Sequence, residues 1–337
     1  MADADVIKKL VAELNKTVGE DSPFMTLGDP DFVRVPDCVS TQVLTVDRAL
    51  GTPGIPCGRV TSIAGKISHG KTTFTIYLMA EAQRRGGKVV LFDTEHAFDP
   101  NWATKLGVNA DEVIVSQPPH LEAVLSKTEA VITGLSKAMP DVPHLIVWDS
   151  VSETPTMHEV KGDFDEYQVA EHSRILSKAF RKLCSTLDGT KIAWVLVSQL
   201  KETVDSFGSW GEPQTTFLAK NAIGYASTIM MEVKRIQTLK IEKTKEDVGI
   251  KCEVKVTKNK LAPPFRKGTF NLLFDSGIDT WGAALEVAAD AKLVDKKGGG
   301  WYEYGERKFQ LADWPTVAME TGLWSTLKEG AWKVSTS

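Results

Sequence analysis

Residues 65–73 constrain the fold of this chain most, because they read G-x-x-x-x-G-K-T-T between an apolar run and a helix-like stretch. Residues 60–64 have the pattern of a buried strand, and residues 74–84 have the pattern of a helix. Two glycines let the backbone curl until successive N–H groups point inward, and the following helix adds its positive N-terminal end. The segment is therefore predicted to bind the phosphates of ATP or GTP. Its strand–loop–helix context distinguishes it from a glycine turn that merely precedes a lysine.

Two side chains of this loop have specific predicted roles. Lys71 is long enough to reach the outer phosphates, and the hydroxyl of Thr72 suits a magnesium ion. The other residues predicted to surround the nucleotide are Gly65, Lys66, Ile67, Ser68, His69, Gly70 and Thr73.

Length and composition favour one large globular core with smaller appendages. The chain has 337 residues, of which 42% are hydrophobic and 25% charged, and these values argue against disorder. It contains no apolar run of about 18 residues, so no membrane span is expected, and its first residues lack the pattern of a secretory signal. The four cysteines form no C-x-x-C pair. Reduced thiols in the cytoplasm are expected, rather than a zinc site or a disulfide framework.

From residue 60 onward, strand-like and helix-like segments alternate. Apolar runs at 88–93, 113–116, 144–149 and 191–198 stand between helical stretches near 70–85, 120–138 and 166–187. This order predicts an α/β fold with a mostly parallel, twisted sheet and helices on both faces. Three consecutive strand-like segments, 227–236, 251–257 and 268–274, predict an antiparallel extension of that sheet.

Two flanking regions complete the predicted organisation. Residues 6–18 repeat apolar side chains on one helical face, so residues 1–38 are predicted to be a helical arm that packs on something else, such as another copy of the chain. Residues 39–280 are the predicted core. Residues 281–337 are predicted to form a small C-terminal α/β domain, with a helix at 283–292 and a glycine turn at 298–300.

Three predicted strands end in polar residues that suit phosphate chemistry. Asp149 ends one apolar strand, where a carboxylate could hold magnesium through water. Glu95 follows a second strand and is a candidate to orient the attacking water, with a helix cap or a surface charge as the less favoured alternative. Gln199 ends a third strand, where its amide could bond the terminal phosphate and report its loss to the stretch that begins at Lys201.

Two irregular stretches, 154–166 and 201–220, each follow a strong strand. Loops at the carboxyl ends of strands carry the function of open α/β sheets. Residues 220–267 hold twelve Lys and Arg against five Asp and Glu, although the net charge of the whole chain is −4. This excess is compatible with a nucleic-acid partner and equally with a solvated pair of strands.

Several short motifs, in order along the chain, resemble the bacterial RecA recombinase family. Besides the phosphate loop they are Asp93-Thr94-Glu95-His96-Ala97-Phe98-Asp99-Pro100, Lys105-Leu106-Gly107-Val108, Val115-Ser116-Gln117-Pro118, Asp149-Ser150-Val151, Arg181-Lys182-Leu183 and Val256-Thr257-Lys258-Asn259-Lys260-Leu261-Ala262-Pro263-Pro264-Phe265. The resemblance runs from about residue 22 to about residue 304, and its divergence from typical bacterial members suggests a phage-encoded relative. It implies a RecA-type P-loop ATPase core, with ATP and Mg²⁺ as cofactors.

The resemblance also implies roles for individual residues. Glu95 matches the catalytic glutamate, Asp149 the magnesium-associated aspartate, and Gln199 the phosphate-sensing glutamine. Lys258 and Lys260 match paired lysines that reach across a filament interface to the neighbour's ATP, where they would neutralise developing charge; otherwise they are solvated lysines at a strand end. With Lys71, these complete the predicted catalytic set. The residues implied to contact the base, either tryptophan of which could instead belong to the core, are Asp99, Trp102 and Trp281.

The two irregular stretches correspond to the family's DNA-binding loops, at about 154–172 and 201–221, inside a helical filament of protomers. Aromatic side chains of the second loop could wedge between stacked bases while backbone N–H groups hold phosphates, or they could pack locally. The residues predicted to bind DNA are Arg174, Arg181, Lys201, Phe207, Gly208, Trp210, Gly211, Phe217 and Asn221.

Together these implications predict an ATP-dependent homologous recombinase with DNA-stimulated ATP hydrolysis. The expected partners are single-stranded DNA, homologous duplex DNA, other copies of the chain in a helical filament, and single-strand-binding or mediator proteins, in the cytoplasm of a bacterial or phage-infected cell. The main alternative is a ring-forming motor or helicase, or another DNA-dependent P-loop ATPase, on the same core. A small-molecule kinase would need an arginine-bearing lid. A filament-forming DNA-binding protein with feeble hydrolysis is compatible with the unusual Ile67 and Gly224.

Overall fold

The computed structural model describes residues 2–18, 24–27, 36–162, 170–202, 215–216 and 218–330, and the chain divides into two units, Met1–Pro36 and Asp37–Ser337.

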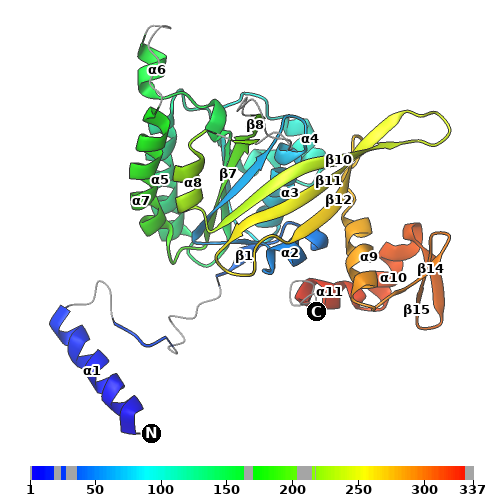
Figure 1. The fold of residues 1–337 in the computed structure, drawn as a ribbon, viewed down its shortest axis with the longest axis horizontal. Helices are drawn as coiled ribbons and strands as arrows, with labels where there is room; N and C mark the ends of the chain where they lie inside the picture. Colours follow the sequence, from blue (N-terminus) through cyan, green and yellow to red (C-terminus); the bar gives the residue numbers. More distant parts are fainter. Residues whose placement is uncertain are drawn as a thin grey trace, which may run out of the picture. The chain divides into compact units, whose positions relative to one another are not determined.

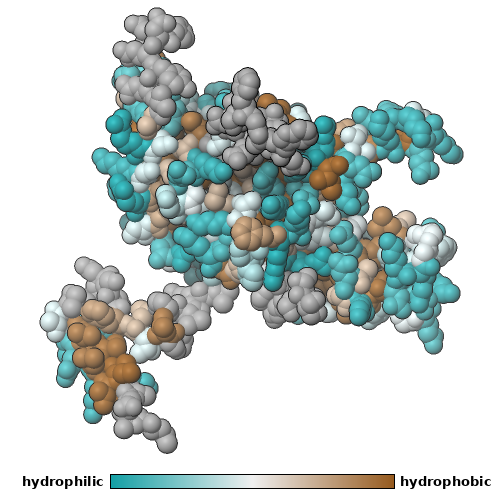
Figure 2. Space-filling model, in the orientation of Figure 1, coloured by the Kyte–Doolittle hydropathy of each residue, from teal (hydrophilic) through white to brown (hydrophobic). Residues whose placement is uncertain are grey.

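The first unit contains α1 (Ala2–Val18), which confirms the predicted N-terminal helix. Its side chains Val6, Ile7 and Leu10 are at least half exposed, and Figure 2 shows an apolar patch on this helix. A helix with an exposed apolar stripe needs a partner surface. The packing of this helix on another copy of the chain remains a prediction.

A nine-stranded sheet is the centre of the second unit, and it confirms the predicted parallel sheet with an antiparallel extension. Strands β10, β3, β7, β6, β4 and β5 run parallel, and β11, β12 and β13 continue from β10 in antiparallel order. In spatial order the strands are β13 (Gly277–Ile278), β12 (Lys267–Leu273), β11 (Asp247–Asn259), β10 (Ile229–Lys240), β3 (Arg59–Gly65), β7 (Ile192–Gln199), β6 (His144–Asp149), β4 (Val89–Asp93) and β5 (Val113–Ser116).

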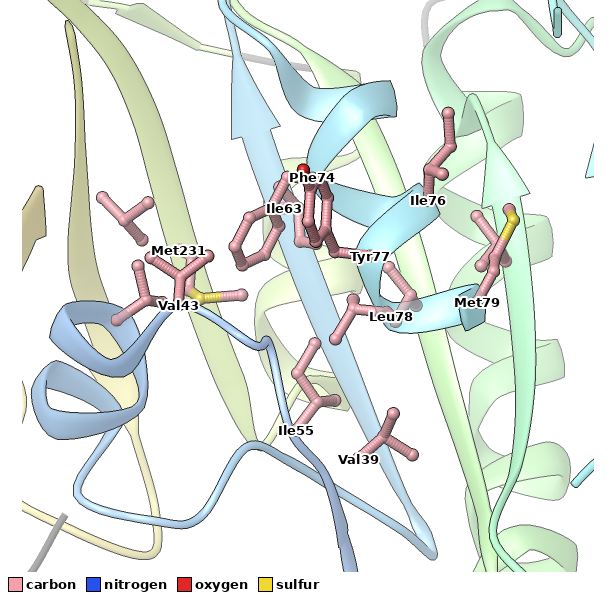
Figure 3. Packing of buried hydrophobic residues seen from close by; sticks show 14 of the residues in the cluster. Val39, Val43, Ile55, Ile63, Phe74, Ile76, Tyr77, Leu78, Met79 and Met231 are labelled. Carbon is pink, nitrogen blue, oxygen red and sulfur yellow. The ribbon is translucent and has the colours of Figure 1, made fainter. Parts of the chain in front are cut away.

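Helices cover both faces of the sheet (Figure 1). On one face lie α2 (Leu44–Leu50) and α3 (Lys71–Arg84), and Figure 3 shows Phe74 and Leu78 of α3 beside Ile63 of β3. On the other face lie α5 (Leu121–Ala138), α7 (Glu171–Leu187) and α8 (Lys220–Ala226), which enclose the buried Trp148 and Trp194. Because both faces are covered, β4, β6 and β7 are largely apolar, which explains their sequence runs.

The C-terminal residues add a cluster of their own. It packs Trp314 and Phe309, both almost fully buried, against α9 (Thr280–Asp290). This helix begins at Thr280 rather than at the predicted residue 283, because the Asp279 carboxylate accepts a hydrogen bond from the Gly282 N–H and caps it. The other elements of this region are β14 (Asp295–Gly298), β15 (Trp301–Tyr304), β16 (Arg307–Gln310), η3 (Leu311–Asp313), α10 (Trp314–Glu320) and α11 (Leu323–Gly330).

The remaining elements are short, and most have no clear periodic pattern in the sequence. They are β1 (Cys38–Val39), β2 (Ile55–Pro56), α4 (Pro100–Lys105), η1 (Ala110–Glu112), η2 (Val151–Glu153), α6 (Met157–Lys161), β8 (Lys201–Glu202) and β9 (Thr215–Thr216). Among the helices of the described residues, none has the length and apolar character needed to cross a membrane.

Asp47 of α2 is a carboxylate buried inside this framework, with 3% of its surface exposed. It accepts hydrogen bonds from the Thr41 N–H (3.1 Å), the Thr41 hydroxyl (2.7 Å) and the Ser40 hydroxyl (2.8 Å). Burial raises the pKa of Asp47 to about 6, although the bonds from Thr41 and Ser40 oppose that shift. Since the ordinary pKa is 3.8, the folded chain binds this proton more tightly than the unfolded chain. The resulting stability is fully present below about pH 4 and is lost as the pH rises through about 6.

We therefore expect the stability of Asp47→Asn to increase relative to that of the wild type as the pH rises. Between about pH 4 and pH 7 the difference in free energy of unfolding should shift toward the variant by roughly 3 kcal/mol, because each pKa unit corresponds to about 1.4 kcal/mol. Urea denaturation of both proteins across this range measures the shift. A difference that stays constant with pH would contradict it.

Candidate functional site

Residues 65–73 join β3 to α3, which is the context predicted for a phosphate-binding loop. Both loop glycines are structurally required. A Cβ on Gly65 would lie 2.6 Å from the Val233 carbonyl oxygen, and Gly70, which precedes α3, has a φ of +84°. Both positions therefore need glycine, as the tightly curled backbone of a phosphate-binding loop requires.

Lys71 and Thr72 begin α3 at the edge of this loop. The Lys71 Nζ donates to the Lys66 carbonyl oxygen at 2.9 Å, and Lys71 is only 8% exposed. Burial lowers the pKa of Lys71, while the carboxylates of Asp149 and Glu95 oppose that shift. The ammonium group is thus partly desolvated, and a cation in such surroundings attracts a phosphate more strongly than a cation in bulk water does.

Thr72 and Asp149 meet directly. The Thr72 hydroxyl donates to the Asp149 Oδ2 at 2.8 Å, and burial raises the pKa of Asp149 to about 6 despite this bond. A hydroxyl and a carboxylate are the hard oxygen ligands that magnesium prefers, so these residues fit that ion. In the part of the chain that the structure describes, no group of three or more His, Cys, Asp or Glu side chains could hold a metal.

Glu95 and Gln199, which belong to different strand ends, are brought into contact. The Gln199 Nε2 donates to the Glu95 Oε1 at 2.8 Å, and the Ser150 hydroxyl donates to the same oxygen. The Gln199 N–H in turn donates to the Ser152 hydroxyl at 3.0 Å. One carboxylate oxygen is therefore held by side chains that follow β6 and end β7. Sequence reasoning missed Ser150, although a hydroxyl directly after the strand-ending Asp149 was a usable signal.

The three residues predicted to contact the base lie in two different surroundings. Asp99 caps α4, where its Oδ1 accepts from the backbone N–H groups of Asn101 (2.8 Å) and Trp102 (3.1 Å). Trp102 packs on the main core cluster. Trp281 instead joins the C-terminal cluster, with its ring centroid 4.5 Å from that of Trp324. Contact of these side chains with a base remains a prediction.

Lys258 and Lys260 lie near the amino-terminal end of β3, whereas the phosphate loop of their own chain follows the carboxyl end of that strand. The Lys258 Nζ donates to the Gly224 carbonyl oxygen of α8, and burial, followed by the charge of Lys260, lowers the pKa of Lys258. The Lys260 N–H donates to the Thr228 carbonyl oxygen, and the Thr228 N–H donates to that of Val60. Val60 precedes Gly65 by five residues of β3, which corresponds to about 16 Å. An extended lysine side chain is too short to span that distance.

The predicted DNA-binding residues are described only in part. Arg174 and Arg181 are exposed on α7, Asn221 is exposed on α8, and Lys201 is exposed in β8 with its Nζ 4.0 Å from Glu153. The predicted residues Phe207, Gly208, Trp210, Gly211 and Phe217 lie outside the described residues. The described residues therefore belong to α7, which follows the first irregular stretch, and to the two ends of the second predicted loop.

Comparison with known proteins gives consistent results. The model of the RecA N-terminal domain family matches residues 5–279. The protein RecA of Desulfovibrio desulfuricans is 36% identical over 307 residues, which cover 91% of this chain and 82% of the relative. The protein RecA of Chlamydia pneumoniae is 36% identical over 302 residues, with 90% and 82% covered. The protein RecA of Prochlorococcus marinus is 37% identical over 295 residues, with 88% and 74% covered.

Proposed function

Since this chain belongs to the RecA family, we propose that it is an ATP-dependent homologous recombinase that forms filaments on single-stranded DNA and pairs it with homologous duplex. The observation that supports this most is the joint placement of a phosphate loop, the Thr72–Asp149 pair and the Glu95–Gln199 pair at the ends of neighbouring parallel strands. Ligands of open α/β sheets bind at this edge.

The side chains at this edge suit hydrolysis of ATP. Lys71 and the N–H groups of the loop would bind the outer phosphates, and Thr72 and Asp149 would hold a magnesium ion. When bound, such an ion would neutralise part of the negative charge of the phosphates. Glu95 would orient the attacking water, and the amide of Gln199 would hold that carboxylate until the terminal phosphate offers a better partner.

Lys258 and Lys260 are proposed to act on the nucleotide of a neighbouring protomer. Their position about 16 Å along β3 from the loop prevents them from serving their own nucleotide. An active site that needs two copies makes hydrolysis depend on assembly, and a head-to-tail interface of this kind generates a helical filament when it does not close. Two ammonium groups would there stabilise the charge that develops on the transferred phosphoryl group.

Arg174 and Arg181 of α7 are proposed to contact the DNA, together with Lys201 and Asn221 at the two ends of the second predicted loop. Arginine and lysine side chains position a DNA backbone without reading its sequence, as a recombinase requires. We further propose that the protein acts in the cytoplasm, together with single-strand-binding or mediator proteins.

The proposed function predicts that single-stranded DNA raises ATP turnover by at least about tenfold, because filament assembly completes each active site. Steady-state hydrolysis measured with and without single-stranded DNA tests this. Electron microscopy with DNA and a non-hydrolysable ATP analogue should show continuous helical filaments. Equal rates with and without DNA would contradict a recombinase, and closed rings would favour a motor built on the same core.

A further inference from the structure

A continuous series of hydrogen bonds leads from Glu95 to α7. It begins at Ser150, whose hydroxyl donates to the Glu95 Oε1. The carbonyl oxygen of the same residue accepts from the Thr94 hydroxyl at 3.0 Å and from the Thr154 hydroxyl at 2.8 Å. The position of Ser150, and hence its hold on Glu95, is therefore set by two threonines.

Thr154 is the centre of this series, and it is 1% exposed. Its hydroxyl accepts from the Trp148 Nε1 at 3.0 Å and lies 2.8 Å from the Thr94 hydroxyl. Trp148 is fully buried in the second core cluster, so this end of the series is anchored to a rigid part of the fold. A buried hydroxyl with several partners has little freedom to move alone.

His172 connects Thr154 to the first turn of α7. Its Nε2 lies 3.0 Å from the Thr154 carbonyl oxygen and 3.5 Å from the Glu159 carboxylate of α6. Because a carbonyl oxygen can only accept, the Nε2 must carry the proton of this bond. The His172 side chain is 11% exposed, so the bond is largely shielded from water.

The same turn of α7 is also tied to the start of α6. The Thr156 hydroxyl donates to the Glu171 carboxylate at 3.0 Å, and the Thr156 N–H donates to the Glu159 carboxylate at 2.7 Å. α6 lies within residues 154–172, the first predicted DNA-binding loop, and α7 begins at the C-terminal end of that loop. Arg174, a predicted DNA contact, lies two residues after His172 on the same helical turn.

We propose that His172 is a positioning residue that couples DNA contact at α7 to the placement of Glu95 through Thr154 and Ser150. This inference rests on the proposed function. It adds a second connection between DNA contact and Glu95, separate from the one through Gln199. A small shift of the first turn of α7 would displace the Thr154 carbonyl, because the bond is short and buried. That displacement would move Ser150 and release one of the two hydrogen bonds that hold the Glu95 Oε1, the other being that of Gln199.

The test compares two variants of His172. His172→Leu removes the N–H donor but keeps apolar bulk, whereas His172→Gln offers an N–H near the position of Nε2. We expect the leucine variant to lower DNA-stimulated turnover by about tenfold, the effect of roughly one lost hydrogen bond. Its DNA-free turnover should fall by much less than tenfold, so that the ratio of the two rates falls, and the DNA concentration that gives half-maximal stimulation should stay close to the wild-type value. The glutamine variant should recover most of the stimulation.

Glu129→Gln is a matched control, because it breaks a different contact of α7, the exposed pair of Glu129 on α5 with Lys182. Its stimulation by DNA should equal that of the wild type, since exposed pairs contribute little. The coupling role is overturned if His172→Leu keeps full stimulation, if His172→Gln is equally impaired, or if DNA-free turnover falls by the same factor. A wild-type protein that DNA does not stimulate would instead contradict the proposed function itself.

Discussion

Lys71→Ala should abolish ATP turnover while the protein stays folded. The ammonium group is the buried cation of the phosphate loop, and its removal should lower turnover by at least about a hundredfold, as expected for loss of a preorganised charge at a reacting phosphate. Stability should not fall, because burial lowers the pKa of Lys71, which means that the folded chain disfavours its charged form. Hydrolysis with single-stranded DNA measures the first effect, and thermal unfolding measures the second.

Two companion variants make this result specific. Lys71→Arg should fail as well, because a Cβ on Gly65 would already lie 3.3 Å from the Lys71 side chain, so the lysine stem runs along the glycine with little room for a guanidinium fork. Lys88→Ala removes an exposed lysine that pairs with Glu112 at 3.0 Å, and it should turn over ATP normally. More than a tenth of wild-type turnover in Lys71→Ala would contradict the assigned role.

Two inactive variants should restore turnover when they are mixed. Glu95→Gln lacks the residue that orients water but keeps both lysines, whereas the double variant Lys258→Ala with Lys260→Ala keeps Glu95 but lacks the cations proposed to act on the neighbour. In a mixed filament, some interfaces join a protomer that keeps Glu95 to a neighbour that keeps both lysines. At equal amounts these are about a quarter of all interfaces, so turnover should reach about a quarter of the wild-type value.

This outcome follows from the position of Lys260 about five residues of β3 away from the phosphate loop of its own chain. Nucleotide binding by the double variant, measured with a fluorescent ATP analogue, should be retained because its own loop is intact. The control is Lys240→Ala with Lys243→Ala, which also removes two exposed lysines from the β10–β11 hairpin and should leave turnover near normal. Normal turnover by the Lys258/Lys260 variant alone would refute action across an interface, and so would a mixture without activity.

Strands of the sheet were predictable because both of their faces are buried. β4, β6 and β7 read as unbroken apolar runs, and each predicted range agrees with the observed strand to within about one residue. β10 and β11 are longer than predicted, since their outer parts leave the core and form the hairpin that extends from the sheet in Figure 1. Exposed strands lack the apolar pattern on which such predictions depend.

Within the site, features made of consecutive residues could be predicted, whereas contacts between residues far apart in the sequence could not. The phosphate loop is contiguous, so its glycines, Lys71 and Thr72 could be recognised directly from the order of residues. The pairing of Thr72 with Asp149 spans 77 residues, and that of Glu95 with Gln199 spans 104. Polar residues at these strand ends were predicted individually, but which of them touch depends on the lateral order of β3, β7, β6 and β4.

Sequence alone was therefore sufficient for the strand–loop–helix unit, the parallel sheet and the chemistry of each strand end, because each depends on neighbours along the chain. Folding in three dimensions was needed to join Ser150, Thr154 and His172 into one hydrogen-bonded series, and to separate Lys260 from its own phosphate loop. The reason is that hydrogen bonds and charge act over a few ångströms through space, whereas the spacing of residues along a chain does not say which strand ends will lie side by side.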